Sequence, residues 1–527
     1  MNRLLFLLSC CFSVYGDNFL ILHPVYVGSH EFTLRNLGEL LVKRGHSVSQ
    51  VVFKRENVIY PRSSVELIEL TVDMKNGSIQ SHNFNEFGEV CMDNNIFWMR
   101  KRRFWTVPLS IIDMNSLQCE TLLGDPALLS MLQARNYSAV IIDLFTNSCG
   151  MIFSSLLKIP TIGFLQIGAV GLEGRYIGAL NPPSVSSQVM SDLGVPNTFL
   201  ERTWGSINAV ADWLIHNYVQ TRVAVSIAEK YLDEVPDVYE LFGRLDLIIS
   251  GSHPIVEFPK YMPQKMLSIG CFHCRPAQRI QNKVLREFLD TSPFPVILAS
   301  FGYTMANNGI YQRKLLRELM KAVKDLPVRA VIAFDPDREE KELVPENVLL
   351  VRWVPQQDVL GHPKTALFIS HCGISSTLEA VYHAAKVIAI PISLDQGENA
   401  LRLKDLGVLN HILDPRVAKA EDVAKFIEDD LEDDRLMENA IKFSQLMRDS
   451  LVGIEDITMR RINQAIKYRG QHLNIPSYKL NIFQFYCLDV ALFFLVLILC
   501  CAKVSLTLFK RSYRYWRILP VIKEKGE

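Results

Sequence analysis

The sequence predicts an α/β protein with two doubly wound domains of parallel sheet and a C-terminal membrane helix. Three observations lead to this expectation. The 527 residues exceed the ~150 residues of a typical domain more than threefold. Short apolar runs of strand length alternate with amphipathic segments of helix length, which is typical of parallel α/β sheets. A further apolar run near the C-terminus is long enough to cross a bilayer.

Composition limits the classes of function. Hydrophobic residues make up 49% of the chain, enough for large buried cores, which excludes a disordered protein and a disulfide-stapled miniprotein. Lys+Arg and Asp+Glu number 56 each, so the formal net charge is zero. Because no net positive field is available to hold a polyanion, we expect no nucleic-acid partner.

The two ends of the chain predict a secreted, membrane-anchored protein. The apolar run Leu4–Val14 follows Arg3, so we expect residues 1–16 to be a cleaved signal peptide. A second apolar run lies around the segment 482–502, which we assign as the transmembrane helix. The tail 503–527 has an excess of Lys and Arg, which the positive-inside rule assigns to the cytosol. The body of the protein is therefore expected in the lumen.

The first domain is predicted at residues 17–270. Its first strand, Phe19–Leu22, is followed by a helical pattern and by a second strand, Val48–Phe53. The pattern recurs with strands at Ala139–Asp143 and Ile159–Phe164. No Gly-x-Gly-x-x-Gly follows the first strand, which argues against a dinucleotide-dependent oxidoreductase.

The second domain is predicted at residues 285–475, after a linker at 271–284 that has little periodicity. A charged helical segment from Ala418 to about Lys467 closes it. Further strands, the first of them just before the linker, are expected at Leu247–Ile249, Val296–Phe301, Ala330–Phe334, Leu349–Trp353, Leu367–Ser370 and Val387–Ile390.

Cysteines and sequons fit an oxidising compartment. Cys271 and Cys274 form a C-x-x-C pair, but no second pair stands at zinc spacing, so we favour a structural role over a metal or redox site. Asn76 and Asn136 each begin an Asn-x-Ser sequon, and both are candidate glycosylation sites in a lumen.

One stretch of the second domain combines residues suited to a nucleotide sugar. A Trp at a strand end offers a flat face to a base, and a nearby Gln can hydrogen-bond the edge of a uracil. A strand that leads through His and Gly into a helix presents N–H groups and the helix dipole to a pyrophosphate. A Glu one turn later suits ribose hydroxyls, and an Asp-Gln pair suits the sugar. These residues are Trp353, Gln356, His371, Gly373, Ser375, Ser376, Glu379, Asp395 and Gln396.

In these residues the chain resembles the donor-binding signature of the UDP-dependent glycosyltransferases, an inverting family that includes membrane-bound glucuronosyltransferases. Each residue alone is more often a helix cap or a core residue, but their joint order and spacing reverse those odds. The resemblance extends over nearly the whole chain. It implies the GT-B fold, with two facing Rossmann-like domains and the donor held mainly by the second. It also implies no metal and no cofactor, the UDP-sugar being a co-substrate.

Two positions depart from the family pattern. Ser375 stands where most members carry Asn, and Tyr303 follows Gly302 where a small hydroxyl residue is usual. Thr304 is the candidate to replace that hydroxyl, so Gly302 and Thr304 form a candidate phosphate loop. These departures keep open a catalytically silent, membrane-anchored protein of the same fold that binds a sugar nucleotide or a lipid.

For catalysis, the resemblance implies His30 in the first βα loop as the base and Asp143, at a strand end, as its partner carboxylate. Imidazole titrates near neutrality, which suits proton removal from an acceptor hydroxyl. The carboxylate would fix the histidine tautomer. A metal-dependent transferase is a third possibility because Asp335-Pro-Asp337 has the Asp-x-Asp form, but we interpret it as a surface turn and expect no metal site.

The sequence therefore predicts a UDP-glycosyltransferase that moves a hexosyl or glucuronosyl group to a hydroxyl of a small lipophilic acceptor, with inversion. Lys523 and Lys525 resemble a dilysine retrieval signal, which implies the endoplasmic reticulum membrane, with the catalytic body in the lumen and a short cytosolic tail. The expected partners are the UDP-sugar, the acceptor and the membrane, and a homo-oligomer stays open.

Overall fold

The computed structural model describes residues 16–23, 28–53, 63–70, 106–145, 147–166, 174–179, 182, 184, 194–214, 221–302, 310–336, 338–392 and 395–523. The chain divides into two compact units, residues 1–474 and 475–527. The predicted positions Asn76, Thr304 and Lys525 lie outside the described residues.

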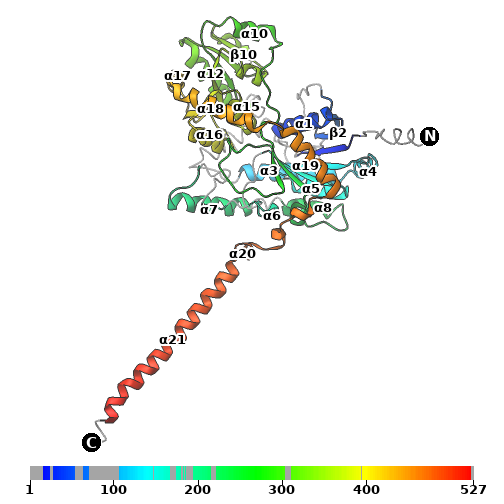
Figure 1. Cartoon of the computed structure of the whole chain (residues 1–527). Helices are drawn as coiled ribbons and strands as arrows, with labels where there is room; N and C mark the ends of the chain where they lie inside the picture. Colours follow the sequence, from blue (N-terminus) through cyan, green and yellow to red (C-terminus); the bar gives the residue numbers. More distant parts are fainter. Residues whose placement is uncertain are drawn as a thin grey trace, which may run out of the picture. The chain divides into compact units, whose positions relative to one another are not determined.

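The first unit contains two parallel sheets with helices on their faces (Figure 1). This confirms the predicted α/β class. The first sheet has seven strands in the order β3-β2-β1-β4-β5-β6-β7. Its strands are β1 (Asn18–Leu22), β2 (Ser47–Phe53), β3 (Glu66–Leu70), β4 (Ala139–Asp143), β5 (Thr161–Leu165), β6 (Leu247–Ser250) and β7 (Met266–Ser268).

The second sheet has six strands in the order β10-β9-β8-β11-β12-β13. They are β8 (Val296–Ser300), β9 (Arg329–Ala333), β10 (Val348–Val351), β11 (Thr365–Ser370), β12 (Lys386–Ala389) and β13 (Leu409–Ile412). In both sheets the strand order reverses direction beside the first strand, at β1/β4 and at β8/β11. Such switch points are where open parallel sheets bind ligands, beyond the carboxyl ends of the strands.

Helices connect the strands in both halves. Those of the first half are α1 (Gly28–Lys43), α3 (Thr106–Leu123), α4 (Pro126–Ala134), α5 (Ser148–Leu156), α6 (Gly174–Ile177), α7 (Phe199–Trp213), α8 (Thr221–Ala228) and α9 (Val238–Gly243). Those of the second half are α10 (Lys283–Asp290), α12 (Ile310–Lys324), α13 (Arg338–Glu342), α14 (Gln356–Leu360), α15 (Ile374–Tyr382), α16 (Gln396–Asp405), α17 (Ala420–Glu432), α18 (Asp434–Ser450) and α19 (Ile454–Tyr468), followed by the 3-10 turn η2 (Gln471–Leu473).

Helix α1 shows how the sequence pattern produces the packing. Leu34, Leu37 and Leu41 recur at helical spacing and are fully buried against the first sheet. Burying each of them contributes about 2 kcal/mol. The helix ends before Gly45, whose φ of +90° is a conformation that favours glycine. This packing fixes the first turn of α1 next to the strand ends, where His30 lies.

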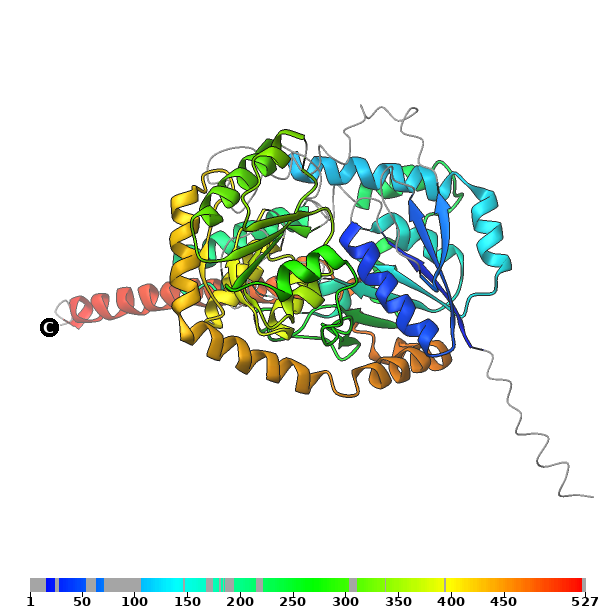
Figure 2. The same cartoon turned by 90° about the horizontal axis from the view of Figure 1, so that it is seen from above.

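The last helices return from the second sheet to the first, which the sequence did not predict. Helix α18 contacts α15 and β12 of the second half, whereas α19 contacts β6 of the first sheet. Met459, Ile462 and Ala465 of α19 share a core with Phe19 and Ile21 of β1. Figure 2 shows this run of helices passing along both halves of the first unit. The two sheets are therefore joined by packing as well as by the segment 271–282.

Two disulfides link cysteines of the first unit in pairs that the sequence left open. Cys119 of α3 is bonded to Cys149 of α5, and Cys271 is bonded to Cys274. The C-x-x-C pair is thus a disulfide. Of the remaining described cysteines, Cys372 is free and buried.

The second unit contains the 3-10 turn η3 (Pro476–Lys479), α20 (Ile482–Phe485) and the long helix α21 (Leu488–Lys523). The segment Leu488–Arg514 is long and apolar enough to cross a membrane, with a mean hydropathy of 2.5. Asp489 lies in its first turn, where an interface can hydrate a carboxylate.

Candidate active site

A histidine–aspartate pair lies at the carboxyl edge of the first sheet. His30 is in the first turn of α1, and Asp143 is the last residue of β4, which pairs with β1. The His30 Nδ1 atom is 2.6 Å from Asp143 Oδ2. His30 is 6% exposed and Asp143 is fully buried. The structure thus brings together two residues that are 113 positions apart in the sequence.

The surroundings of Asp143 determine which ring nitrogen of His30 carries the proton. Asp143 Oδ1 accepts the Phe145 backbone N–H at 2.9 Å, and the Asn147 side chain donates to the Asp143 carbonyl at 2.9 Å. Asn147 Oδ1 in turn accepts from Gln118 at 3.0 Å. An ionised carboxylate only accepts hydrogen bonds, so His30 Nδ1 carries the proton. The Nε2 atom is then the basic nitrogen of the neutral ring.

The second sheet supplies a helix N-terminus. Strand β11 ends at Ser370, and His371 and Cys372 lead to Gly373, the N-cap of α15. Gly373 has no side chain to cap the helix, so N–H groups of the first turn stay available to an acceptor such as a phosphate. One of them, the Ile374 N–H, hydrogen-bonds the Asp395 carboxylate.

His371 is packed between two glycines. A Cβ atom on Gly302 or Gly373 would lie 2.7 Å or 2.5 Å from His371 Nε2, so a side chain at either position would collide with the ring. Gly302 also has a φ of +70°. Burial lowers the pKa of His371 to about 4, so the imidazole is neutral at pH 7. A neutral imidazole has one N–H to donate, and the Ser300 backbone is one hydrogen-bond partner of this ring.

The remaining predicted polar residues of α15 are joined by side-chain amides. Gln356 Nε2 donates to Ser376 Oγ at 3.1 Å and to Glu379 Oε2 at 2.6 Å. Ser375 Oγ accepts from Gln166 Nε2 at 3.0 Å. Gln166 follows β5 of the first sheet, 209 residues earlier. The sequence analysis missed this residue because no local pattern marks a contact between the two sheets.

Trp353 follows β10, and its side chain is 68% exposed. Its ring centroid is 6.5 Å from that of Phe32 in α1. An indole this exposed offers a face on which a base can stack.

Asp395 and Gln396 begin α16. Asp395 Oδ2 accepts from Asn399 Nδ2 at 2.6 Å, and Gln396 Oε1 accepts from the Ile392 N–H at 2.7 Å. Burial raises the pKa of the Asp395 carboxyl, while the Asn399 hydrogen bond and the charge of His30 oppose this shift. His30 of the first half and Asp395 of the second half therefore interact electrostatically.

The arrangement has the parts that a group transfer from a nucleotide requires. The described residues combine a histidine oriented by a buried carboxylate, an exposed aromatic face, a helix N-terminus and several hydroxyls and amides. Of the predicted glycosylation sites, Asn136 is exposed at a positive φ of 49°.

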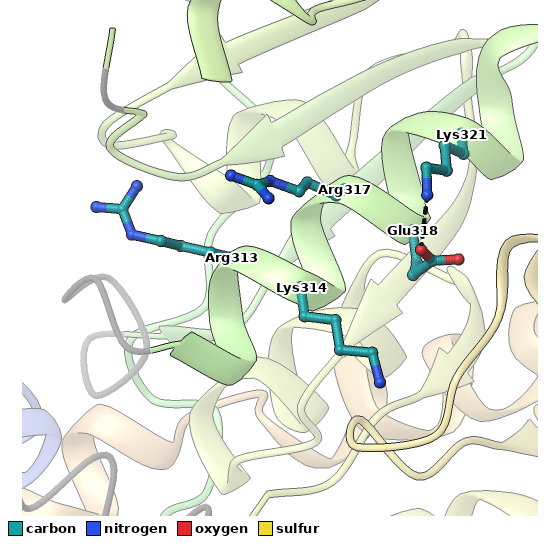
Figure 3. Close-up of a pocket in the computed structure, with 5 residues that line it drawn as sticks. All are labelled: Arg313, Lys314, Arg317, Glu318 and Lys321. Carbon is teal, nitrogen blue, oxygen red and sulfur yellow. Dashed lines mark hydrogen bonds and ion pairs between the residues drawn. The ribbon is translucent and has the colours of Figure 1, made fainter. Parts of the chain in front are cut away.

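Two other features are less suited to binding. A depression of about 410 Å³ on α12 is lined by Arg313, Lys314, Arg317, Glu318 and Lys321 (Figure 3). Its cations already have partners: for example, Arg313 pairs with Glu340 at 2.8 Å and Lys321 with Glu318 at 3.0 Å. In the predicted Asp-x-Asp turn, the carboxylate of Asp335 is 3.5 Å from Arg352. The described residues include no group of three or more His, Cys, Asp or Glu placed to hold a metal ion.

Solved structures share this fold. Phytolacca americana UGT2 complexed with UDP-2fluoro-glucose and pterostilbene aligns with a TM-score of 0.57 at 17% identity, covering 85% of this chain and 99% of that chain. The glycotransferase of kitacinnamycin aligns with a TM-score of 0.56 at 16% identity, covering 85% and 99%. The two parallel sheets are therefore those of a GT-B glycosyltransferase, as predicted.

A family model described as UDP-glucuronosyl and UDP-glucosyl transferase matches residues 20–524, so the chain belongs to that family and is a UDP-glycosyltransferase. Human UDP-glucuronosyltransferase 2B17 is 27% identical over 504 residues, which cover 93% of this chain and 92% of the relative. UDP-glucuronosyltransferase 2B19 of Macaca fascicularis is 26% identical over 542 residues, which cover 99% and 98%.

Proposed function

We propose that the protein transfers a hexosyl or glucuronosyl group from a UDP-sugar to a hydroxyl of a small lipophilic acceptor, with inversion at the anomeric carbon. The observation that carries this proposal is the 2.6 Å bond between His30 and Asp143. It leaves Nε2 as the nitrogen of His30 that is free to take a proton.

The reaction needs one proton transfer and one displacement. His30 Nε2 takes the proton of the acceptor hydroxyl while the oxygen attacks the anomeric carbon. The bond from that carbon to the UDP oxygen breaks, and UDP leaves with the electron pair. Asp143 stabilises the imidazolium that forms.

The donor roles follow from the described contacts. Trp353 would stack on the uracil, and Gln356 and Glu379 would hold the base edge and the ribose. The diphosphate would lie at the N-terminus of α15, between His371, Gly373 and the hydroxyls of Ser375 and Ser376, with Gly302 on the other side of the His371 ring. Asp395 and Gln396 would hold hydroxyls of the sugar. Helix N–H groups and hydroxyls neutralise the phosphates in this arrangement, so we expect a chelator to leave the rate unchanged.

The location of the enzyme is a separate proposal. Helix α21 would anchor the chain in the endoplasmic reticulum membrane, with the body in the lumen and the lysines at 523 and 525 as a retrieval signal. Replacing both with Ser should send part of the protein onward, seen as Golgi-type maturation of glycans on Asn76 or Asn136. Identical distribution and equally endoglycosidase-sensitive glycans in both forms would contradict a retrieval role.

A turnover experiment tests the proposed activity. The purified full chain is incubated with several UDP-sugars and a panel of lipophilic alcohols and phenols, and released UDP is measured. UDP release that depends on the acceptor supports the transferase. A rise in melting temperature with UDP but no release from any pair supports the alternative, a silent binding protein of the same fold.

A further inference from the structure

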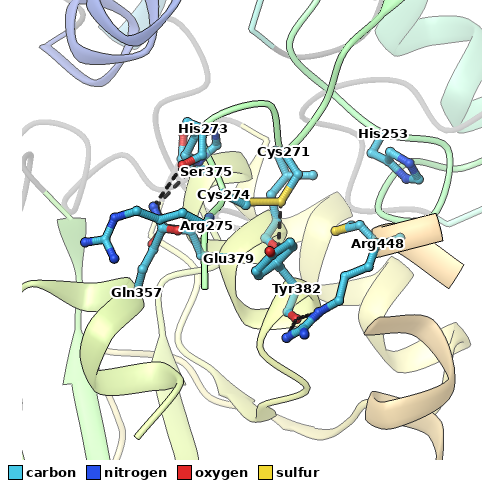
Figure 4. Close-up of a disulfide and its surroundings, with 12 residues drawn as sticks. His253, Cys271, His273, Cys274, Arg275, Gln357, Ser375, Glu379, Tyr382 and Arg448 are labelled. Atoms are coloured by element: carbon cyan, nitrogen blue, oxygen red, sulfur yellow. Dashed lines mark hydrogen bonds and ion pairs between the residues drawn. A yellow bond between two sulfur atoms is a disulfide. The ribbon is translucent and has the colours of Figure 1, made fainter. Parts of the chain in front are cut away.

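A disulfide-closed turn connects the two sheets next to Glu379. Cys271, fully buried, lies in the core of the second sheet, while its neighbour Phe272 packs on the core of the first. The disulfide from Cys271 to Cys274 closes the turn, and the Cys274 N–H donates to the Cys271 carbonyl at 2.8 Å. Figure 4 shows this turn beside the α15 residues Ser375, Glu379 and Tyr382. The position of His273, which lies inside this turn, is therefore fixed.

The side-chain amide of Gln357 in α14 hydrogen-bonds the backbone of the same turn. Gln357 Nε2 donates to the His273 carbonyl at 3.2 Å and to Glu379 Oε1 at 3.3 Å. Gln357 Oε1 accepts from the Arg275 N–H at 2.8 Å. One side chain thus holds both the backbone of the turn and the carboxylate assigned to the ribose.

The imidazole of His273 is buried without a hydrogen bond. Its side chain is 8% exposed, and neither ring nitrogen has a hydrogen-bond partner among the described residues. The Nε2 atom is 3.6 Å from Glu379 Oε1, which is longer than a hydrogen bond. Leaving a buried polar atom unpaired is unfavourable, so an imidazole in this position needs a further partner, which a bound ligand can supply.

We propose that His273 is a second ribose contact of the donor site, an inference that rests on the proposed function. The Glu379 carboxylate accepts and the His273 N–H donates, so the pair matches a vicinal diol. One ribose hydroxyl donates to Glu379 while its neighbour accepts from His273. The amides of Gln356 and Gln357 keep the carboxylate in place, and the disulfide keeps the imidazole in place. The ligand class is a nucleoside diphosphate with both ribose hydroxyls.

The test compares affinities of UDP, 2′-deoxy-UDP and 3′-deoxy-UDP, measured by calorimetry on the full chain in detergent. The wild type should bind UDP more tightly than either deoxy analogue. In His273→Ala, UDP affinity should fall about fivefold, the value of one ordinary hydrogen bond. The preference for UDP over one of the analogues should fall by the same factor, because only the hydroxyl that meets His273 is affected.

Three further variants keep the result interpretable. His273→Gln can place an amide N–H near the Nε2 position and should retain most of the preference, whereas the shorter His273→Asn should lose it. If the Ala variant does not fold, the comparison of the Gln and Asn variants provides the test. His383→Ala, a matched control at the other end of α15, should leave the preference unchanged. Equal preferences in wild type, Gln and Asn forms would overturn the role of His273 alone. Failure of the wild type to bind UDP would overturn the proposed function itself.

Discussion

The Asp143→Asn variant tests the catalytic pair most closely, because the structure limits what an amide can do there. Asp143 accepts two hydrogen bonds, from His30 Nδ1 at 2.6 Å and from the Phe145 N–H at 2.9 Å. If the Asn oxygen faces His30, its NH₂ group meets the Phe145 N–H, and two buried donors face each other. If the amide turns over, it donates to Nδ1, and the ring proton moves to Nε2, where the base must be free.

The magnitude follows from these two losses. Placing the Asn NH₂ group against the Phe145 N–H costs about 1 to 3 kcal/mol. The amide orientation that keeps the His30 proton on Nδ1 is therefore the less populated one. The missing charge removes a further ~1.5 to 3 kcal/mol of stabilisation from the imidazolium, the value of a hydrogen bond to a charged group. At ~1.4 kcal/mol per factor of ten, kcat should fall by roughly two to four orders of magnitude.

The assay is UDP release under saturating donor and acceptor, with UDP affinity measured in parallel. Affinity for UDP should change less than about twofold, because the hydrogen bonds of Asp143 join residues of the first half, whereas the proposed diphosphate site is on α15. Asp246→Asn is a matched control, since Asp246 is another buried carboxylate but bonds to the Thr161 and Gly470 N–H groups. It should lower stability and leave kcat nearly unchanged. A folded Asp143→Asn enzyme with more than a tenth of wild-type kcat would refute the assignment.

Three further outcomes are expected. Trp353→Ala should weaken UDP binding by roughly 1 to 3 kcal/mol, the scale of base stacking, and equal calorimetric affinities would contradict the platform role. Burial lowers the pKa of His371 from 6.5 to about 4, so as the pH falls the unfolded chain takes up this proton first. The contribution of the neutral imidazole to the free energy of unfolding, at most ~3 kcal/mol, is intact above about pH 6.5 and is lost as the pH falls toward 4. Urea unfolding at pH 7 and pH 5 measures this loss. Because the entropy that a disulfide removes from the unfolded chain grows with loop length, removing the Cys119–Cys149 disulfide, which spans 30 residues, should lower the free energy of unfolding by about 3.5 kcal/mol. Removing Cys271–Cys274, which spans 3 residues, should lower it by about 2 kcal/mol. A larger loss for the shorter loop would contradict this ranking.

Strands with continuous apolar residues were predictable from the sequence. Ala139–Ile142 and Leu367–Ile369, the centres of β4 and β11, are continuous apolar runs because both faces of a parallel sheet are covered by helices. The expected strand Ala139–Asp143 is β4 itself. By contrast, Glu66–Leu70 contains two glutamates and lies at the edge of its sheet as β3, so its pattern resembles a surface segment. Edge strands of this kind carry too little hydrophobic signal to be recognised.

The local chemistry of the site was also predictable, but its assembly was not. A strand, His371, a glycine and a helix follow one another along the chain, so the N-terminus of α15 could be inferred from sequence order. The contact of Gln166 with Ser375 and the approach of His273 to Glu379 depend on how two sheets pack. Likewise, α19 has the charged surface of any exposed helix, and only the packed structure shows that it returns to the first sheet.

The most direct test of the account is the product of a single reaction. The purified full chain, with EDTA present, is supplied with an α-linked UDP-sugar and an acceptor alcohol from the panel, and the product is examined by NMR spectroscopy. We expect UDP and a β-linked glycoside in equal amounts. The His30→Ala enzyme should bind UDP normally but form the product at least a hundredfold more slowly, the lower bound of general base catalysis. An α-linked product, or equal rates for the wild type and the His30→Ala enzyme, would contradict the mechanism.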